Sequence, residues 1–107
     1  YRLLDSGPGK EINRQMNTRQ LHYVIKVAEE RSFSVAAKKL YIAQPSLSQF
    51  ISKVEKELGY ELFDRMATPL KLTAAGEVYI KTAQEILNLE QAMEIACATW
   101  ASLNTEN

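Results

Sequence analysis

The chain has 107 residues, of which 46% are hydrophobic and 24% are charged, with four glycines and three prolines. This composition is typical of one small globular domain and excludes collagen-like, low-complexity and wholly disordered proteins. A single cysteine excludes an internal disulfide framework and a zinc site built on several cysteines. Neither an apolar stretch of about 20 residues nor a secretory leader is present, so we expect a soluble cytoplasmic protein.

The formal net charge is zero, but the charges are unevenly distributed. Residues 16–72 carry nine positive and six negative side chains, a net charge of +3. Residues 73–107 carry one positive and five negative side chains, a net charge of −4. A basic body joined to an acidic C-terminal region favours a nucleic-acid partner only slightly, because solvated charges on helices explain the same asymmetry.

Residues 1–15 differ in character from the rest of the chain. They contain Ser6-Gly7-Pro8-Gly9, which is a turn or linker signal. We interpret residues 1–15 as an added leader ahead of a natural start at Met16, or as a flexible extension, and expect them to take no part in the fold.

Apolar periodicity predicts two helices between residues 17 and 40. The first begins at Asn17 or Thr18, with Asn17 as N-cap and Gln20 as its reciprocal partner. It ends near residues 31–32. The second is short and is expected to take Ser34 as its N-cap. A tight connection over residues 41–43 follows it.

A third helix is predicted from Gln44-Pro45 to Gly59. Proline suits the first turn of a helix, and glycine suits the left-handed position that ends one. Residues 60–72 are irregular and predict a two-strand hairpin, with Leu62-Phe63 and residues 70–72 as strands and Pro69 limiting their pairing. The buried side of the third helix consists of Leu47, Ile51, Val54 and Leu58.

A long helix is predicted from a cap at Thr73 to about Trp100. Its apolar residues recur at the a and d positions of successive heptads, as in a coiled coil. A helix of this length cannot bury the whole seam against so small a body, so we expect it to pair with a second copy. The seam consists of Tyr79, Thr82, Ile86, Leu89, Met93, Ala96, Trp100 and Leu103.

The order helix, short helix, tight turn, helix and hairpin is that of a winged helix-turn-helix. Small residues at Ala36 and Ala37 suit a close helix crossing, and Ile42 provides an aliphatic plug inside the turn. The predicted fold is therefore mainly α, with a three-helix body and small β-hairpin wing over residues 16–73. A linker helix over residues 74–103 and a tail over residues 104–107 follow.

Short motifs with matching order and spacing support a more specific resemblance. They are Ser32-Phe33-Ser34, Ala36-Ala37-Lys38-Lys39-Leu40, Gln44-Pro45-Ser46-Leu47-Ser48, Leu58-Gly59, Leu62-Phe63 with Arg65, and Leu72-Thr73-Ala74-Ala75-Gly76. With them, the stretch from Met16 to about Leu89 resembles the N-terminal DNA-binding domain of LysR-type transcriptional regulators.

The resemblance implies a bacterial transcription factor that binds double-stranded DNA as a homodimer, with its long linker helices paired antiparallel. It also implies a C-terminal effector-binding domain of the periplasmic-binding-protein type outside this chain. A small-molecule effector would act through that domain, and the full-length protein could form a tetramer. No membrane partner is expected.

The third helix is expected to present its polar side to the major groove. Gln49 suits adenine, Lys53 suits guanine or a phosphate, and the helix start offers free N–H groups to a phosphate. Solvated surface residues are the alternative interpretation. Phe50 lies at the edge of the buried stripe, where core packing or a thymine methyl contact would fit. The predicted DNA-binding residues are Ser34, Gln44, Pro45, Ser46, Ser48, Gln49, Lys53, Arg65 and Lys71.

The sequence departs from the family pattern at Gln49 and at Thr68. The family often has arginine at the position of Gln49, which puts a guanine contact there in doubt. It commonly has a basic residue at the position of Thr68, so this wing would bind the DNA backbone less strongly.

In the long helix, the predicted dimerisation residues are Tyr79, Ile86, Leu89, Met93, Ala96 and Trp100.

The remaining reactive side chains do not form a recognisable catalytic or metal-binding motif. His22 has no partner motif, Cys97 is predicted to be a buried apolar thiol, and Glu55 and Glu57 point to different sides of a helix. We therefore predict no cofactor, no metal site and no enzyme activity. The alternatives are a winged helix used only for protein–protein contact through the acidic long helix, and a small enzyme.

Overall fold

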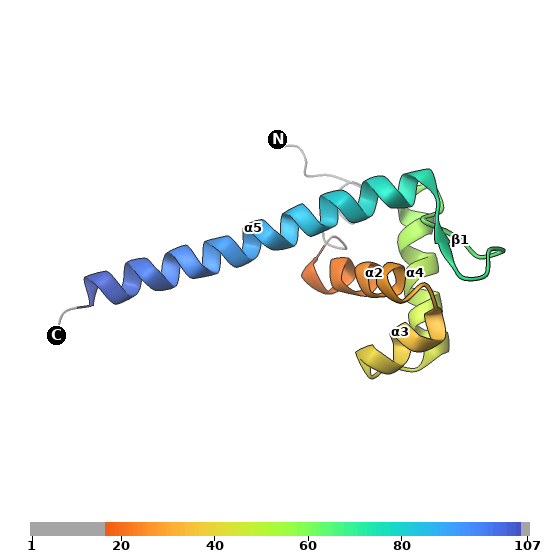
Figure 1. Ribbon diagram of the computed structural model, residues 1–107, viewed down its shortest axis with the longest axis horizontal. Coiled ribbons are helices and arrows are strands. Elements are labelled where there is room, and N and C mark those ends of the chain that lie inside the picture. Colours follow the sequence, from red (N-terminus) through yellow and green to blue (C-terminus); the bar gives the residue numbers. More distant parts are fainter. Residues whose placement is uncertain (1–16, 106–107) are drawn as a thin grey trace.

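The computed structural model describes residues 17–105. The interpretation of residues 1–15 as a leader or extension, and of Met16 as a natural start, lies outside this range. The secondary structure is mainly helical, as the sequence predicts (Figure 1). The elements are α2 (Thr18–Glu30), α3 (Phe33–Leu40), α4 (Gln44–Leu58), β1 (Phe63–Asp64), β2 (Lys71–Leu72) and α5 (Ala74–Asn104).

Most of the predicted helix ends are confirmed, with one correction. Asn17 caps α2, its side chain accepting a hydrogen bond of 2.9 Å from the Gln20 backbone N–H. The prediction that Ser34 caps α3 is wrong: Ser32 is the cap, and its hydroxyl accepts from the Val35 N–H at 3.1 Å. Ser32 has the extended backbone that a cap requires, whereas Ser34 already lies within the helix. The Ser34 side chain is therefore exposed on the first turn of α3.

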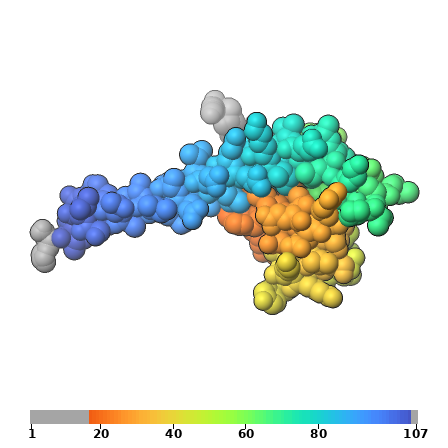
Figure 2. All heavy atoms as spheres, viewed as in Figure 1, coloured from red at the N-terminus to blue at the C-terminus, as the bar shows by residue number. Residues whose placement is uncertain are grey.

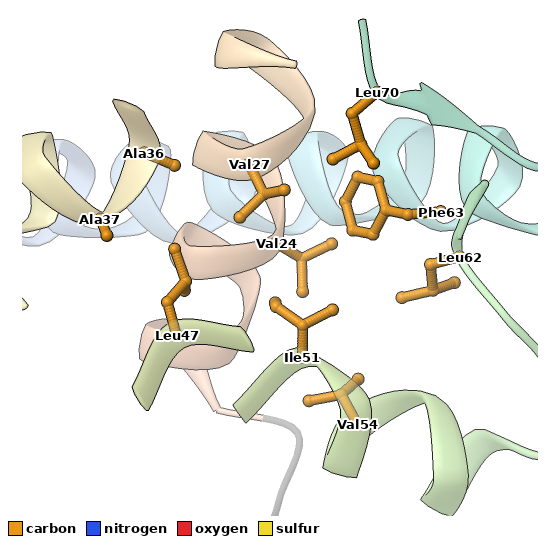
Figure 3. Close-up of a cluster of buried hydrophobic side chains, with 10 residues drawn as sticks. All are labelled: Val24, Val27, Ala36, Ala37, Leu47, Ile51, Val54, Leu62, Phe63 and Leu70. Atoms are coloured by element: carbon orange, nitrogen blue, oxygen red, sulfur yellow. The ribbon is translucent and has the colours of Figure 1, made fainter. Parts of the chain in front are cut away.

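One hydrophobic core holds the three-helix body and the wing together (Figure 3). Complete burial of a valine, leucine, isoleucine or phenylalanine side chain stabilises a fold by roughly 1.5–3 kcal/mol relative to exposure of that side chain to water. Partly buried Ile42 packs against this core from the turn between α3 and α4, as expected. The core consists of Val24, Val27, Ala36, Ala37, Leu47, Ile51, Val54, Leu62, Phe63 and Leu70.

The wing is a short antiparallel hairpin in which Phe63 pairs with Leu72 and Asp64 with Lys71. Two residues in each strand are too few for a hairpin that is stable alone, so its position depends on anchors to the body. The Leu70 N–H donates to the Arg31 carbonyl at 3.2 Å, and the Thr73 N–H donates to the Leu62 carbonyl at 2.9 Å.

Helix α5 packs tightly where it leaves the wing. A Cβ added at Gly76 would lie 2.0 Å from the Leu62 carbonyl oxygen, so this crossing needs a glycine. Thr73 caps the helix as predicted, its hydroxyl accepting from the Gly76 N–H at 3.0 Å. The helix ends at Asn104, four residues beyond Trp100 and one residue beyond the linker boundary predicted at residue 103.

The first part of α5 lies on α2, and the rest extends away from the body (Figures 1 and 2). Ala83 is buried with Leu21 and Ile25 of α2. Further along α5, the Thr18 hydroxyl donates a 2.9 Å hydrogen bond to a Glu90 carboxylate oxygen. Residues 91–105 are all exposed, and the molecule is consequently elongated, with extents of 58 × 36 × 25 Å.

Candidate nucleic-acid interface

Helix α4 has one buried side and one polar side. Leu47, Ile51 and Val54 face the core, whereas Gln49 and Lys53 are exposed. The expectation that Gln49 and Lys53 lie on the outside is thereby confirmed, although their contact with DNA stays a prediction. The exposed residues of α4 are Gln44, Pro45, Ser46, Gln49, Ser52, Lys53 and Lys56, with Ser48 half-buried beside them.

The start of α4 is open to a ligand because its N-cap residue is Ala43, which makes no side-chain cap hydrogen bond. The first backbone N–H groups of a helix have no partner within the helix and carry partial positive charge, which suits a phosphate. Pro45 lies in this first turn, where its missing N–H costs nothing. The helix start therefore has the polarity expected of an anion contact.

The cations near this surface are available for a polyanion. Among residues 17–105, Lys53, Lys56 and Lys71 form no ion pair with another described side chain, and all three are exposed. Lys39, at the end of α3, instead pairs with Glu30 at 3.0 Å. Three of the unpaired, exposed lysines of the described residues therefore lie on α4 and on the wing.

Arg65 occupies a different environment from these lysines. Its Nη1 donates to Glu55 Oε1 at 2.9 Å, and its guanidinium carbon lies 5.1 Å from the centre of the Phe33 ring. Phe33 in turn packs edge-on against Phe63, with ring centres 6.0 Å apart. The guanidinium is therefore held by Glu55 and Phe33 although Arg65 is itself partly exposed, whereas Lys71 on β2 has no ion-pair partner among the described residues.

Glu55 is a site residue whose role the sequence analysis missed. Its carboxylate is buried and accepts from the Leu62 N–H at 2.7 Å and the Phe63 N–H at 3.2 Å. The missed signal was its spacing: Leu47, Ile51 and Glu55 follow one another every four residues on the buried side of α4.

Phe50 lies half-buried between the two sides of α4. Its ring packs against Tyr23 of α2, with ring centres 4.9 Å apart. Of the two predicted roles, core packing is the one that this geometry supports.

The predicted dimerisation residues fall into two groups. Tyr79 is half-buried in its own chain, where its hydroxyl accepts from Gln20 Nε2 at 3.1 Å. Burial raises the pKa of Tyr79. The others line an exposed stripe along α5; they are Ile86, Leu89, Met93, Ala96 and Trp100.

The exposed stripe continues into an apolar groove of about 410 Å³ at the base of α5. Ala75, Val78 and Ile86 line it from α5, Leu58 lines it from the end of α4, and Tyr60 from the segment that follows. The prediction that Cys97 is buried is wrong, because it lies on the part of α5 that extends beyond the body.

Two findings about other classes of site concern the described residues. Residues 17–105 contain no group of three or more histidine, cysteine, aspartate or glutamate side chains arranged to hold a metal ion. Over the same range, each helix is too short or too polar to cross a bilayer.

A three-helix body with a polar helix side next to a β-hairpin defines the winged helix-turn-helix class of nucleic-acid-binding folds. The family model for bacterial regulatory helix-turn-helix proteins of the lysR family matches residues 18–77. The chain belongs to this family, as its motifs suggested.

Similar proteins are transcriptional regulators. The chain is 42% identical over 76 residues to TfdT of Cupriavidus pinatubonensis, which covers 71% of this chain and 33% of that protein. It is 47% identical over 77 residues to BudR of Klebsiella aerogenes, which covers 72% of this chain and 54% of that protein. The chain therefore spans about half of these relatives or less.

Solved structures give the same result for the fold. The DNA-binding domain of BenM, in its complex with the catB site 1 DNA, superposes with a TM-score of 0.75 and 36% identity. The match covers 85% of this chain and all of that one. The DNA-bound DNA-binding domain of CbnR has a TM-score of 0.74 and 35% identity, covering 80% of this chain and 99% of that one.

Proposed function

We propose that the chain binds double-stranded DNA by placing α4, hereafter the recognition helix, in the major groove. The observation that carries this proposal is the exposed polar side of α4, on a framework shared with DNA-bound LysR-family domains. The N-terminal part of such a helix reaches base edges. Gln49 and Lys53 are the proposed base or phosphate contacts, and the further proposed DNA contacts are Ser34, Gln44, Pro45, Ser46 and Ser48.

The wing supplies backbone contacts beside the recognition helix. Lys71 is the proposed phosphate contact, because it is exposed on β2 and unpaired among the described residues. Thr68, where the family commonly has a basic residue, is exposed and neutral. We therefore assign most of the positive charge at the interface to α4.

The chain functions as a homodimer in this proposal, with the apolar stripe and groove of α5 as the interface. Two α5 helices paired antiparallel cover both features, since the stripe ends in the groove at the base of the helix. Two recognition helices related by a two-fold axis require a roughly palindromic DNA site. The second interpretation, protein–protein contact alone, explains α5 but leaves the unpaired lysines of α4 without a role.

The whole protein would be a transcriptional regulator of the cytoplasm whose effector binds in a further domain. This part of the proposal rests on the relatives, which are regulators longer than this chain. The family match and the relatives, which are transcriptional regulators, favour this role over that of a small enzyme.

Selection of bound sequences from a random duplex pool, followed by a salt titration on the selected duplex, tests the proposal. Selection should yield a palindromic site, and the binding constant should fall steeply as salt rises because phosphate contacts release counterions. No enrichment over the pool, or an affinity that does not change with salt, would contradict DNA binding and favour a protein partner.

A further inference from the structure

We propose that Glu55 is a positioning residue: with Arg65, it fixes the wing against the recognition helix in the geometry that DNA binding requires. This inference rests on the proposed function. Glu55 belongs to the recognition helix itself, but its side chain is only 8% exposed and points to the core side, away from Gln49 and Lys53. It therefore acts through the wing.

Every contact of the Glu55 carboxylate leads from the recognition helix to the wing. One oxygen accepts from the Leu62 and Phe63 N–H groups at 2.7 and 3.2 Å, and the other accepts from Arg65 Nη1 at 2.9 Å. These three donors lie immediately before, within and after strand β1. The carboxylate thus holds the first strand of the wing along its length.

The other wing anchors reach different elements. Leu70 is bonded to Arg31 at the end of α2, and Leu62, just before β1, is bonded to Thr73, the N-cap of α5. Glu55 joins the hairpin to α4, which is the helix that enters the major groove in the proposed function. A hairpin with two residues per strand cannot set its own position, so the angle between wing and recognition helix depends on this carboxylate.

Burying a carboxylate destabilises a fold, because desolvating a charge is unfavourable unless hydrogen bonds and an opposite charge compensate it. Here both kinds of compensation are present. The Phe33 ring, 5.1 Å from the Arg65 guanidinium carbon, further restricts Arg65. This arrangement assigns Arg65 to wing positioning, which revises its predicted role as a DNA contact.

A purely electrostatic effect of Glu55 and a role in positioning the wing predict opposite changes in DNA affinity when the carboxylate is removed. Neutralising a carboxylate near DNA phosphates should strengthen binding by electrostatics. A displaced wing should weaken DNA binding, because Lys71 and its strand would no longer reach the phosphates that they contact in the proposed complex. Glu57→Gln provides a matched control, since it removes the same charge two residues further along α4.

The test compares Glu55→Gln with Glu57→Gln on a duplex selected by the wild-type chain. We expect Glu55→Gln to bind about tenfold more weakly and to lose hydroxyl-radical protection of the backbone beside the recognition helix, while major-groove protection remains. Glu57→Gln should bind at least as tightly as the wild type. If Glu55→Gln binds as tightly as the wild type with the same footprint, the inference is wrong.

Because loss of a buried carboxylate also destabilises the fold, Arg65→Gln serves as a second variant that leaves the two backbone bonds of Glu55 in place. We expect it to lose the same protection as Glu55→Gln. The double variant should be no weaker than the weaker single variant. Additive losses would mean that Arg65 contacts DNA independently, and would overturn its assigned role.

Hydrogen exchange without DNA separates this inference from the proposed function. In Glu55→Gln, the Leu62 and Phe63 amides should exchange faster relative to the amides of α2, whereas Glu57→Gln should leave that ratio unchanged. An unchanged ratio in Glu55→Gln would overturn the coupling between helix and wing. Failure of the wild-type chain to bind any duplex would instead contradict the proposed function.

Discussion

The winged-helix body and the distal part of α5 use apolar residues in opposite ways. In the body, Val24, Leu47 and Ile51 are fully buried in one core. In distal α5, Leu89 is 71% exposed and Trp100 is 66% exposed, although both lie on a regular apolar stripe. The comparison shows that a helical pattern of apolar residues indicates that a side will be covered, but not which molecule covers it.

The largest effect should come from the body. Replacing Ile51 with alanine leaves a cavity in the core and should lower the free energy of unfolding by about 2–5 kcal/mol. Leu89→Ala is the matched control, and it should change stability by no more than about 0.5 kcal/mol. Urea unfolding of both variants in a Met93→Glu background removes the contribution of dimerisation. Equal losses in the two variants would contradict the distinction between body and distal helix.

The next effect concerns the partner of the distal helix. Met93→Glu places a charge on the exposed stripe, where pairing would bury it without a partner. The dimer should dissociate about tenfold or more readily, and binding to a palindromic duplex should weaken because the two half-sites are no longer held together. Sedimentation equilibrium measures the first effect. Gln91→Glu adds the same charge away from the stripe and should remain dimeric; a Met93→Glu dimer of unchanged stability would refute the assignment.

A smaller effect is expected from a single phosphate contact on the body. Lys53→Ala should weaken binding to all duplexes and reduce the slope of log affinity against log salt by about 1. Lys81→Ala removes an exposed lysine from α5, away from the recognition helix, and should leave the slope unchanged. Identical slopes for wild type and Lys53→Ala would exclude Lys53 from the interface.

The smallest expected effect is a pH dependence of stability that comes from Tyr79, where α5 packs on the body. Burial raises the pKa of Tyr79 above its ordinary value of 10.0, so its phenol is harder to ionise in the folded chain than in the unfolded chain. This stabilisation is complete below the ordinary pKa and is lost as the pH rises through the raised value. Urea unfolding on both sides of that range should show weaker stability at high pH, and Tyr79→Phe should reduce this loss. A pH dependence unaffected by Tyr79→Phe would contradict the assignment.

Much of the fold could be predicted from the sequence because its signals are local. Asn17, Gly59 and Thr73 are helix end signals that depend on neighbouring residues, and all three act as predicted. The misplaced cap of α3 shows the limit of such signals, since two serines stand two residues apart and only the backbone conformation distinguishes them.

The site was less predictable because its geometry depends on contacts between distant segments. The sequence does not show that Glu55 reaches Arg65, ten residues later, from the buried side of α4. Tyr79 fits the heptad pattern, yet its hydroxyl bonds Gln20, 59 residues away. Cys97 is exposed because the described body ends before the helix does.

The most direct test of the central claim is a comparison of the sequences selected from a random duplex pool by the wild-type chain and by Gln49→Ala. If the polar side of α4 lies in the major groove, the variant should lose preference at one symmetric pair of base positions and keep the others. Identical preferences for the two proteins at every position, or no selected site for the wild type, would contradict the assignment of α4 as the helix that reads DNA.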